Sequence, residues 1–325
     1  MKKIFPAKLK ESDMLQVIAP SSSAATTKKS VHNRALKVLT KDLSFAVSFS
    51  KHAYEKDILG SSSLDSRILD FNQAFSDKDI KGILCVRGGY NANTLLQYID
   101  WNKVKENPKP ICGFSDITVL ANAIYAKTGV VSYVGPNFAS FGAEEGVPYV
   151  VEYFKKCLFT ESTFEIKPSK KCGERNIPFK KNAGFKILQN GIATGTLLGG
   201  HLSTFNLLQG TQYMPSLKES ILFLETDDFG GDMAVLEFER DLQSLLQQKD
   251  SNQIAGIVFG RFKKASKITI KKLEYIIFSK KELHNIPIIA NIDFGHTQPI
   301  VTLPIGGVVR IEAKNKAAKI TILKH

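Results

Sequence analysis

The chain has 325 residues and a formal net charge of +13. At this length two domains are expected, because a single hydrophobic core rarely grows beyond about 250–300 residues. Membrane insertion is not expected, since no run approaches the roughly 20 apolar residues that a spanning helix needs. Nucleic-acid binding is not expected either, because the lysines are spread along the chain without interleaved aromatic residues. The positive field favours small acidic substrates instead.

The N-terminal residues and the cysteines both point to the cytoplasm. The first ten residues carry positive charge but no apolar run follows them, so a secretory signal is not expected. No C-x-x-C spacing occurs, which disfavours a structural zinc site and a disulfide framework. The four cysteines are Cys85, Cys112, Cys157 and Cys172.

The first half of the chain alternates between strand-like and helix-like segments. Buried strands are predicted at 15–20, 45–49, 83–86 and directly before Ser115, and helices at 35–39, 63–75, 95–98, 117–124 and 150–158. This alternation predicts an α/β domain whose parallel sheet is covered by helices on both faces. Ligands of such sheets bind beyond the carboxyl ends of the strands.

The composition changes after residue 160. The segment 166–186 is rich in lysine and contains two prolines, so it is predicted to be a solvated linker between domain 1–165 and domain 187–325. The second half holds two predicted strands, 221–224 and 254–259, on either side of a helix at 235–246. Its tail, 286–323, is rich in β-branched residues, glycine and proline, which predicts a compact β arrangement.

The stretch from Ile111 to Ile117 has the pattern of a strand, a sharp turn and a helix around Ser115. A serine at such a corner projects its hydroxyl above the sheet edge, and the backbone N–H of Asp116 points into the same space. That is the arrangement of a nucleophile elbow, in which the residue after the serine donates to an oxyanion. The alternative is a serine that caps an ordinary helix.

A nucleophilic serine needs a base and a group that orients the base. Two of the six histidines, His201 and His296, lie beside glycine-rich corners. His296 follows a predicted strand and is placed to reach across a cleft, although a loop histidine without a role is the alternative. His201 fits the start of a helix equally well. Glu225 ends the strand at 221–224, so its carboxylate either faces a site at the sheet edge or turns to solvent.

Arg87, Gly88 and Gly89 follow the predicted strand at 83–86. Two glycines allow a tight backbone turn that brings an N–H close to a substrate, and a plain strand-to-helix turn is the alternative. Arg87 is a candidate for holding a substrate carboxylate, or for pairing with a neighbouring acid.

Taken together, these segments resemble the LD-carboxypeptidase family of serine peptidases, which also contains the microcin C self-immunity peptidases. The matching stretches occur in family order from about residue 15 to residue 306. They are Val17-Ile18-Ala19-Pro20-Ser21-Ser22, Arg87-Gly88-Gly89-Tyr90, Gly113-Phe114-Ser115-Asp116, Gly199-Gly200-His201-Leu202-Ser203, Leu222-Phe223-Leu224-Glu225 and Gly295-His296.

The resemblance implies a catalytic triad in which Ser115 is the nucleophile, His296 the base and then the acid, and Glu225 the group that fixes the imidazole. The backbone N–H groups of Gly89 and Asp116 would form the oxyanion hole. It further implies a Rossmann-like N-terminal domain, a β-rich, barrel-like α+β C-terminal domain, a homodimer, and a reaction without metal or cofactor.

The substrate that the carboxypeptidase branch implies is a cytoplasmic muropeptide tetrapeptide, from which terminal D-alanine is released during cell-wall recycling. Gly88, Arg87 and His201 are the candidates for binding it. Two positions depart from the family pattern: His201 stands where asparagine is usual, and Phe114 where tyrosine is common.

Two alternatives remain open from the sequence. The stretch 226–240 is closer to the microcin-immunity type, which implies hydrolysis of an aminoacyl or peptidyl nucleotide antibiotic. Trp101, Phe138 and Phe229 are aromatic candidates for stacking on its purine. The second alternative is a protein of another class, which binds a small peptide without cleaving it.

Overall fold

The first sheet is built mainly from the N-terminal half of the chain. A computed structural model describes residues 2–175, 177–227, 231–314 and 317–325. The strand order is β14-β5-β4-β3-β1-β2, and the strands run parallel except for β14, which is antiparallel to β5. The bounds are β1 (Met14–Ile18), β2 (Ala46–Phe49), β3 (Ile80–Cys85), β4 (Ile111–Gly113), β5 (Ser132–Val134) and β14 (Leu303–Ile305).

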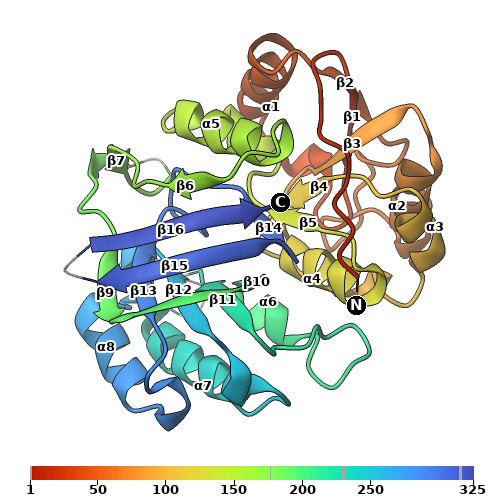
Figure 1. Ribbon diagram of the computed structural model, residues 1–325. Coiled ribbons are helices and arrows are strands. Elements are labelled where there is room, and N and C mark those ends of the chain that lie inside the picture. The colour runs from red at the N-terminus through yellow and green to blue at the C-terminus, as the bar shows by residue number, and fades with distance from the viewer. Residues whose placement is uncertain (1, 176, 228–230, 315–316) are drawn as a thin grey trace.

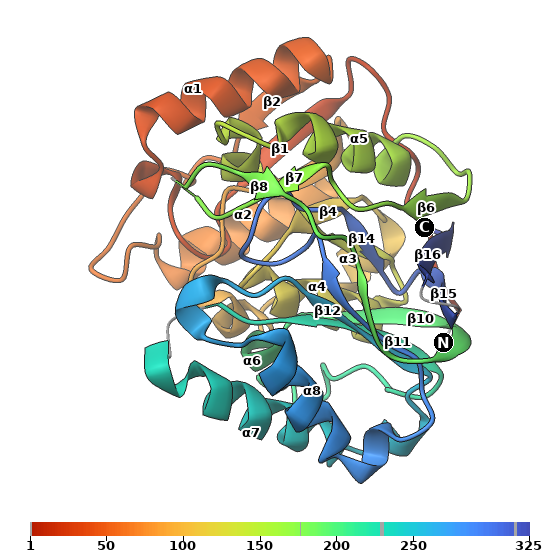
Figure 2. The ribbon, with the colours of Figure 1, turned by 90° about the vertical axis from the view of Figure 1, so that its left-hand side faces the viewer.

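Helices cover both faces of this sheet, as the alternating pattern predicts. They are α1 (Lys29–Lys37), α2 (Leu64–Ser76), α3 (Trp101–Glu106), α4 (Ile117–Thr128) and α5 (Val147–Leu158). The helices α1 and α5 lie on one face, and α2, α3 and α4 on the other (Figure 2). In place of the helix predicted at 95–98, a short 3₁₀ turn spans Ala92–Leu95 and α3 begins at Trp101, because the Asp100 carboxylate caps it.

The second sheet is mixed and carries its own helices. Its strand order is β6-β16-β15-β10-β11-β12-β13-β9, in which β10 to β13 run parallel. The strands are β6 (Phe164–Ile166), β9 (Lys186–Gln189), β10 (Gly191–His201), β11 (Ser220–Glu225), β12 (Gly256–Gly260), β13 (Ile288–Ile292), β15 (Val308–Lys314) and β16 (Ala317–Lys324). The helices are α6 (Leu202–Asn206), α7 (Ala234–Leu246) and α8 (Ile270–Phe278). In Figure 1, α7 and α8 lie on the outer side of this sheet.

This architecture confirms the predicted class, an α/β protein with a Rossmann-like N-terminal sheet and a second, sheet-rich domain. The chain does not divide cleanly between the two sheets, however. The strand β6 pairs with β16 in the second sheet, and β14 returns from the C-terminal half to pair with β5 in the first. The domain limits 1–165 and 187–325 therefore stay a prediction.

The helix α4 joins the two domains. Every residue from Ile117 to Ile124 is buried, because α4 lies between the two sheets (Figure 2). Asn122 makes a reciprocal pair with the backbone of β10: its Nδ2 donates to Gly199 O at 2.9 Å, and Gly199 N–H donates to its Oδ1 at 3.1 Å. One hydrophobic core therefore runs from α2–α4 into the second sheet.

The structure bears on two expectations from the sequence, that disulfides and membrane-spanning helices are absent. All four cysteines carry free thiols, and Cys85, Cys112 and Cys157 are buried. Burial raises the pKa of the Cys112 thiol well above its ordinary value, which makes it a poor nucleophile. Across the described ranges, no helix is both long enough and apolar enough to traverse a bilayer.

We predict that Phe223→Ala destabilises the protein by about 3–5 kcal/mol, because truncating a fully buried aromatic side chain leaves a cavity. Phe223 lies in the central strand β11, with its ring 5.7 Å from that of Phe294. Guanidinium titration of the unfolding free energy measures the loss. Phe278→Ala, at a side chain that is 55% exposed, is the control and should change stability by less than about 1 kcal/mol. Equal losses in the two variants would contradict the assignment of the core.

Candidate active site

Ser115 lies in the turn between β4 and α4, in a strained backbone conformation. Its φ is +63°, a left-handed value that residues other than glycine rarely adopt. Glycines on both sides make the turn possible. A Cβ at Gly88 would lie 2.8 Å from the Ser115 Cβ, and a Cβ at Gly113 would lie 2.9 Å from the Cys85 Cβ. This geometry is that of a nucleophile elbow.

The structure brings Ser115, His296 and Glu225 into one hydrogen-bonded line. The Nε2 atom of His296 lies 3.0 Å from Ser115 Oγ, and its Nδ1 lies 2.8 Å from Glu225 Oε2. The backbone N–H of His296 donates to the same carboxylate oxygen at 3.2 Å. Glu225 is only 1% exposed, so its carboxylate is shielded from water.

Strand order explains why Glu225 and His296 meet. Glu225 ends β11 and His296 follows β13, and both strands run parallel to β12 between them. Their carboxyl ends therefore lie at the same edge of the second sheet. Gly295 permits the close approach: it has φ +95°, and a Cβ there would lie 2.6 Å from Glu225 Oε2.

The pKa shifts of this pair follow from burial and mutual attraction. Burial disfavours the charged form of His296, but the charge and hydrogen bond of Glu225, together with the charge of Asp227, outweigh it and raise the pKa of the imidazole. Burial likewise works to raise the pKa of Glu225, yet the attraction and hydrogen bonds of His296 lower it. The geometry therefore keeps Glu225 ionised and stabilises an imidazolium at His296.

A cavity of about 1060 Å³ opens in front of Ser115 and His296. The other predicted site residues that line it are Arg87, Gly88, Gly89, Asp116 and His201. The Nη1 atom of Arg87 donates to the carbonyl and hydroxyl oxygens of Thr26 at 3.2 and 3.3 Å. Both of those acceptors are neutral, so they hold the guanidinium without cancelling its charge.

Asp116 uses its carboxylate to fix the loops around the serine. It accepts from Ser21 Oγ at 2.5 Å and from the Ala92 backbone N–H at 2.8 Å. Gly89 packs against Ser21 so tightly that a Cβ would lie 2.3 Å from its hydroxyl oxygen. Gly88 also packs against the Asp116 backbone N–H, because a Cβ there would lie 3.3 Å from that nitrogen. The oxyanion-hole role of Gly89 and Asp116 stays a prediction.

The two positions predicted to depart from the family pattern, His201 and Phe114, both pack against the imidazole. The rings of His201 and Phe114 lie 5.2 and 5.5 Å from the His296 ring, each in an edge-to-face arrangement. His201 is buried; its Nδ1 lies 2.8 Å from Thr204 Oγ1, and its Nε2 accepts from the Asp227 backbone N–H at 3.4 Å.

The expectation of no metal stays a prediction. His201, Glu225 and His296 bring potential ligand atoms within 4.8 Å of one another. In this arrangement, however, Glu225 Oε2 and His296 Nδ1 are joined by a hydrogen bond. Of the aromatic candidates for purine stacking, Trp101 packs on Tyr213 with the ring centres 5.7 Å apart, Phe138 is buried, and Phe229 lies outside the described residues.

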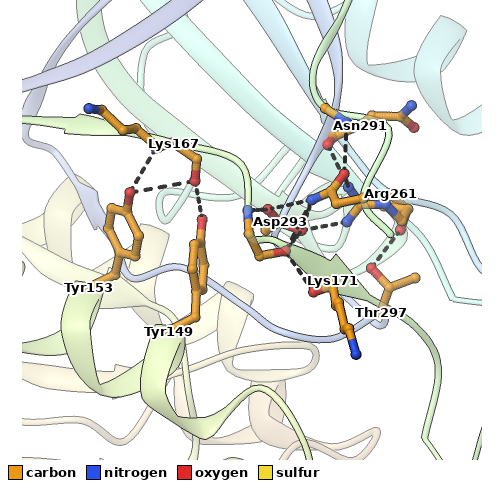
Figure 3. A network of polar contacts seen from close by, with 11 residues as sticks. Tyr149, Tyr153, Lys167, Lys171, Arg261, Asn291, Asp293 and Thr297 are labelled. Carbon is orange, nitrogen blue, oxygen red and sulfur yellow. Dashed lines mark hydrogen bonds and ion pairs between the residues drawn. The ribbon is translucent and has the colours of Figure 1, made fainter. Parts of the chain in front are cut away.

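Sequence reasoning missed the hairpin that forms one wall of the cavity. The strands β7 (Lys171–Cys172) and β8 (Lys180–Lys181) pair within the predicted linker, and residues between them, including Arg175 and Phe179, line the cavity. It also missed Asp293 and Arg261, which form an ion pair in the polar network of Figure 3, three residues before His296 in the case of Asp293. No local motif marks either feature, because their partners are far apart in sequence.

A serine at the carboxyl end of a strand in one sheet, aligned with a histidine and a buried carboxylate from the other, is an arrangement typical of serine hydrolases. Comparison with known proteins specifies the family. The LD-carboxypeptidase N-terminal domain matches residues 15–135, and the LD-carboxypeptidase C-terminal domain matches residues 194–311. The chain belongs to the LD-carboxypeptidase family, and it is a serine peptidase.

Two relatives are similar along their whole length. YocD of Bacillus subtilis, which carries a provisional carboxypeptidase name, is 43% identical over 99% of this chain and 100% of its own. The crystal structure of an MccF-like protein from Bacillus anthracis is 46% identical, covers 99% of this chain and 100% of that chain, and superposes with a TM-score of 0.97.

Two further relatives differ in the substrates that their names imply. The microcin C7 self-immunity protein MccF of Escherichia coli is 28% identical over 98% of this chain and 96% of its own; its structure in complex with aspartyl sulfamoyl adenosine has a TM-score of 0.88 to this chain. The murein tetrapeptide carboxypeptidase of Pseudomonas aeruginosa is 27% identical over 91% of this chain and 92% of its own.

We predict that Glu225→Gln lowers the pKa of His296. The substitution removes the attraction that stabilises the imidazolium, while the burial that opposes it remains. NMR titration of the imidazole ring measures the pKa directly. Glu11→Gln is the control and should leave the pKa of His296 unchanged. Glu11 precedes β1, so it lies at the amino ends of the parallel strands, whereas Ser115 follows the carboxyl end of β4. An unchanged or higher pKa in Glu225→Gln would contradict the contact between the two side chains.

Proposed function

We propose that this protein is a serine carboxypeptidase in which Ser115, His296 and Glu225 form the catalytic triad. The observation that carries the proposal is the pair of contacts at 3.0 and 2.8 Å that joins the three side chains beside a large cavity. The left-handed φ of Ser115 supports it further. A protein that only binds peptides has no need of a strained serine aligned with an imidazole, whereas strain of this kind gathers at reactive sites.

The geometry supports a two-step reaction. Ser115 Oγ attacks the amide carbonyl as His296 Nε2 takes its proton, and the carbonyl oxygen becomes an oxyanion that the backbone N–H groups of Gly89 and Asp116 stabilise. Collapse of the tetrahedral intermediate breaks the C–N bond, and His296 returns the proton to the leaving amine. Water then attacks the acyl-enzyme by the same route, and Glu225 holds the imidazole throughout.

Our first candidate substrate is a muropeptide tetrapeptide, cut between the L centre of its diamino acid and terminal D-alanine. A relative named murein tetrapeptide carboxypeptidase supports it, as does a positively charged group at the cavity wall. Burial and then the like charge of Arg175 lower the pKa of Arg87, and Arg87 has no ion pair with a carboxylate among the described residues. An anionic substrate group would relieve this repulsion.

The second candidate is an aminoacyl or peptidyl nucleotide. It is favoured by the similarity to the self-immunity protein, which extends over 98% of this chain, and by that protein's complex with aspartyl sulfamoyl adenosine. The cavity volume of about 1060 Å³ is also at the upper end of ordinary ligand pockets, which leaves room for a nucleotide. Assembly as a homodimer and a cytoplasmic location stay predictions.

We predict that Ser115→Ala reduces turnover by roughly 10⁴-fold or more, because the nucleophile is lost while the fold remains. Mass spectrometry of products from a muropeptide tetrapeptide and from an aminoacyl sulfamoyl adenosine identifies the substrate class. Wild-type protein should also accumulate a covalent acyl adduct at Ser115 in rapid-quench samples. Ser203→Ala is the matched control at another cavity-lining serine and should form the same Ser115 adduct. Release of product by folded Ser115→Ala at the wild-type rate would refute the mechanism.

We predict that Arg87→Met raises KM for a tetrapeptide with a free terminal carboxylate by about 10- to 100-fold, the cost of losing a charge-assisted contact. The wild-type protein should discriminate against the same peptide ending in a carboxamide, and Arg87→Met should not. Steady-state kinetics of both proteins on both peptides test this. Discrimination that persists in Arg87→Met would exclude Arg87 as the carboxylate-binding group.

A further inference from the structure

A buried polar network behind His296 is centred on Asp293, the residue directly after β13. The Asp293 side chain is 0% exposed, and donors from three segments satisfy it. Ser169 donates from its backbone N–H at 2.7 Å and from its hydroxyl at 3.1 Å, and Asn182 Nδ2 donates to both carboxylate oxygens. Arg261 Nη1 forms an ion pair with Asp293 Oδ1 at 2.6 Å (Figure 3).

Arg261 extends the network to the end of β12. Its Nη2 donates to Asn182 Oδ1 at 2.9 Å and to the Asn291 carbonyl at 3.0 Å. Its own carbonyl accepts from the Thr297 hydroxyl at 3.4 Å, directly after His296 (Figure 3). Arg261 therefore contacts this segment on both sides of His296, through its guanidinium at Asn291 and Asp293 and through its backbone carbonyl at Thr297.

The same carboxylate fixes the base of the β7–β8 hairpin, because Ser169 and Asn182 flank its two strands. Higher up, Gly173 and Gln298 exchange backbone hydrogen bonds at 2.9 and 2.8 Å, so the hairpin pairs directly with the segment after His296. The same contacts therefore hold both the hairpin wall of the cavity and the segment that carries the imidazole.

The N-terminal domain holds the approach to this hairpin. Tyr149 in α5 donates to the Lys167 carbonyl at 2.8 Å, and the Tyr153 hydroxyl accepts from the Lys167 backbone N–H at 2.7 Å (Figure 3). Lys167 lies two residues before Ser169. The hairpin base is thereby anchored on one side to the domain of Ser115 and on the other to the segment of His296.

We propose that Asp293 and Arg261 are positioning residues. They hold the His296 segment and the hairpin base as one unit, and so keep the imidazole within hydrogen-bond distance of the Ser115 hydroxyl. The inference rests on the proposed function. Residues 293–299 form neither helix nor strand, so these side-chain contacts act with the Gly173–Gln298 backbone pair to hold the segment of the imidazole in place. A displacement of about 1 Å at a reacting group costs on the order of 10²-fold in rate. Breaking the pair also leaves a buried charge without its partner.

The test compares Asp293→Asn, Arg261→Met and Arg261→Lys with Arg310→Met. Arg310 is the control arginine, because its ion pair with Glu312 at 3.1 Å lies within β15 and not in the segment of His296. We expect kcat to fall by about 10²-fold in Asp293→Asn and Arg261→Met, to recover in part in Arg261→Lys, and to stay at the wild-type value in Arg310→Met. Arg261 is the safer site for folding, because its side chain is 16% exposed.

The pKa of His296, measured by NMR, separates positioning from simple charge loss. Removing a positive charge at Arg261 would by itself raise the pKa of the imidazole, whereas displacement of His296 from Glu225 would lower it. We expect Arg261→Met to lower it. Within the described residues, the other charged or titratable groups that act on His296 are Glu225, Asp227, Lys263 and His201, and none of the variants alters them.

Two results would overturn the inference: a wild-type kcat in folded Arg261→Met, or a His296 pKa that rises in that variant. Failure of the proposed function has a different signature. In that case the wild-type protein turns over neither candidate substrate, while the NMR titrations still report whether Arg261 and Asp293 position the imidazole.

Discussion

The site depends on the packing of α4 against β10, because its three central side chains come from different domains. Ser115 precedes α4, whereas Glu225 and His296 follow strands of the second sheet. The reciprocal pair between Asn122 and the Gly199 backbone fixes the register of the helix on the strand. The helix α4 is buried along most of its length. A shift of α4 along β10 would therefore break the hydrogen bonds of Asn122 and Gly199 and open cavities in the shared core. That cost is what allows a 3.0 Å contact between Ser115 and His296 to be maintained across a domain boundary.

The same rigid packing maintains the strained backbone at Ser115. A left-handed serine persists only where its surroundings determine its conformation. Here Gly88 and Gly113 remove the side chains that would collide with the turn, and Asp116 ties its far side to Ser21 and Ala92 through a buried carboxylate. The hydroxyl is therefore held in place before any substrate arrives, so little reorganisation is needed in the reaction.

Several features of this molecule were predictable from sequence because they are local. The corner at Ser115 follows from one glycine-containing strand end and one helical period, and Glu225 was identified because it ends an uninterrupted apolar run. The crossing of β14 into the first sheet was not predictable, because three residues of β pattern do not specify which sheet they join. The hairpin of β7 and β8 was interpreted as a solvated linker for a related reason. Its lysines do face solvent, and the contacts that order it come from Asp293 and Gln298, more than a hundred residues away.

Reaction and specificity are carried by different parts of the structure. The line from Ser115 to Glu225 is generic, since it would serve any amide carbonyl presented to the serine. Selection among substrates must then come from groups around that line. His201 and Phe114 pack their ring edges against the imidazole, and the hairpin brings Arg175 to the cavity wall beside Arg87. The hairpin is joined to the His296 segment through Gly173 and Gln298. The wall of the cavity and the segment of His296 are therefore held together by backbone hydrogen bonds, so a change in the hairpin would also be felt at the imidazole.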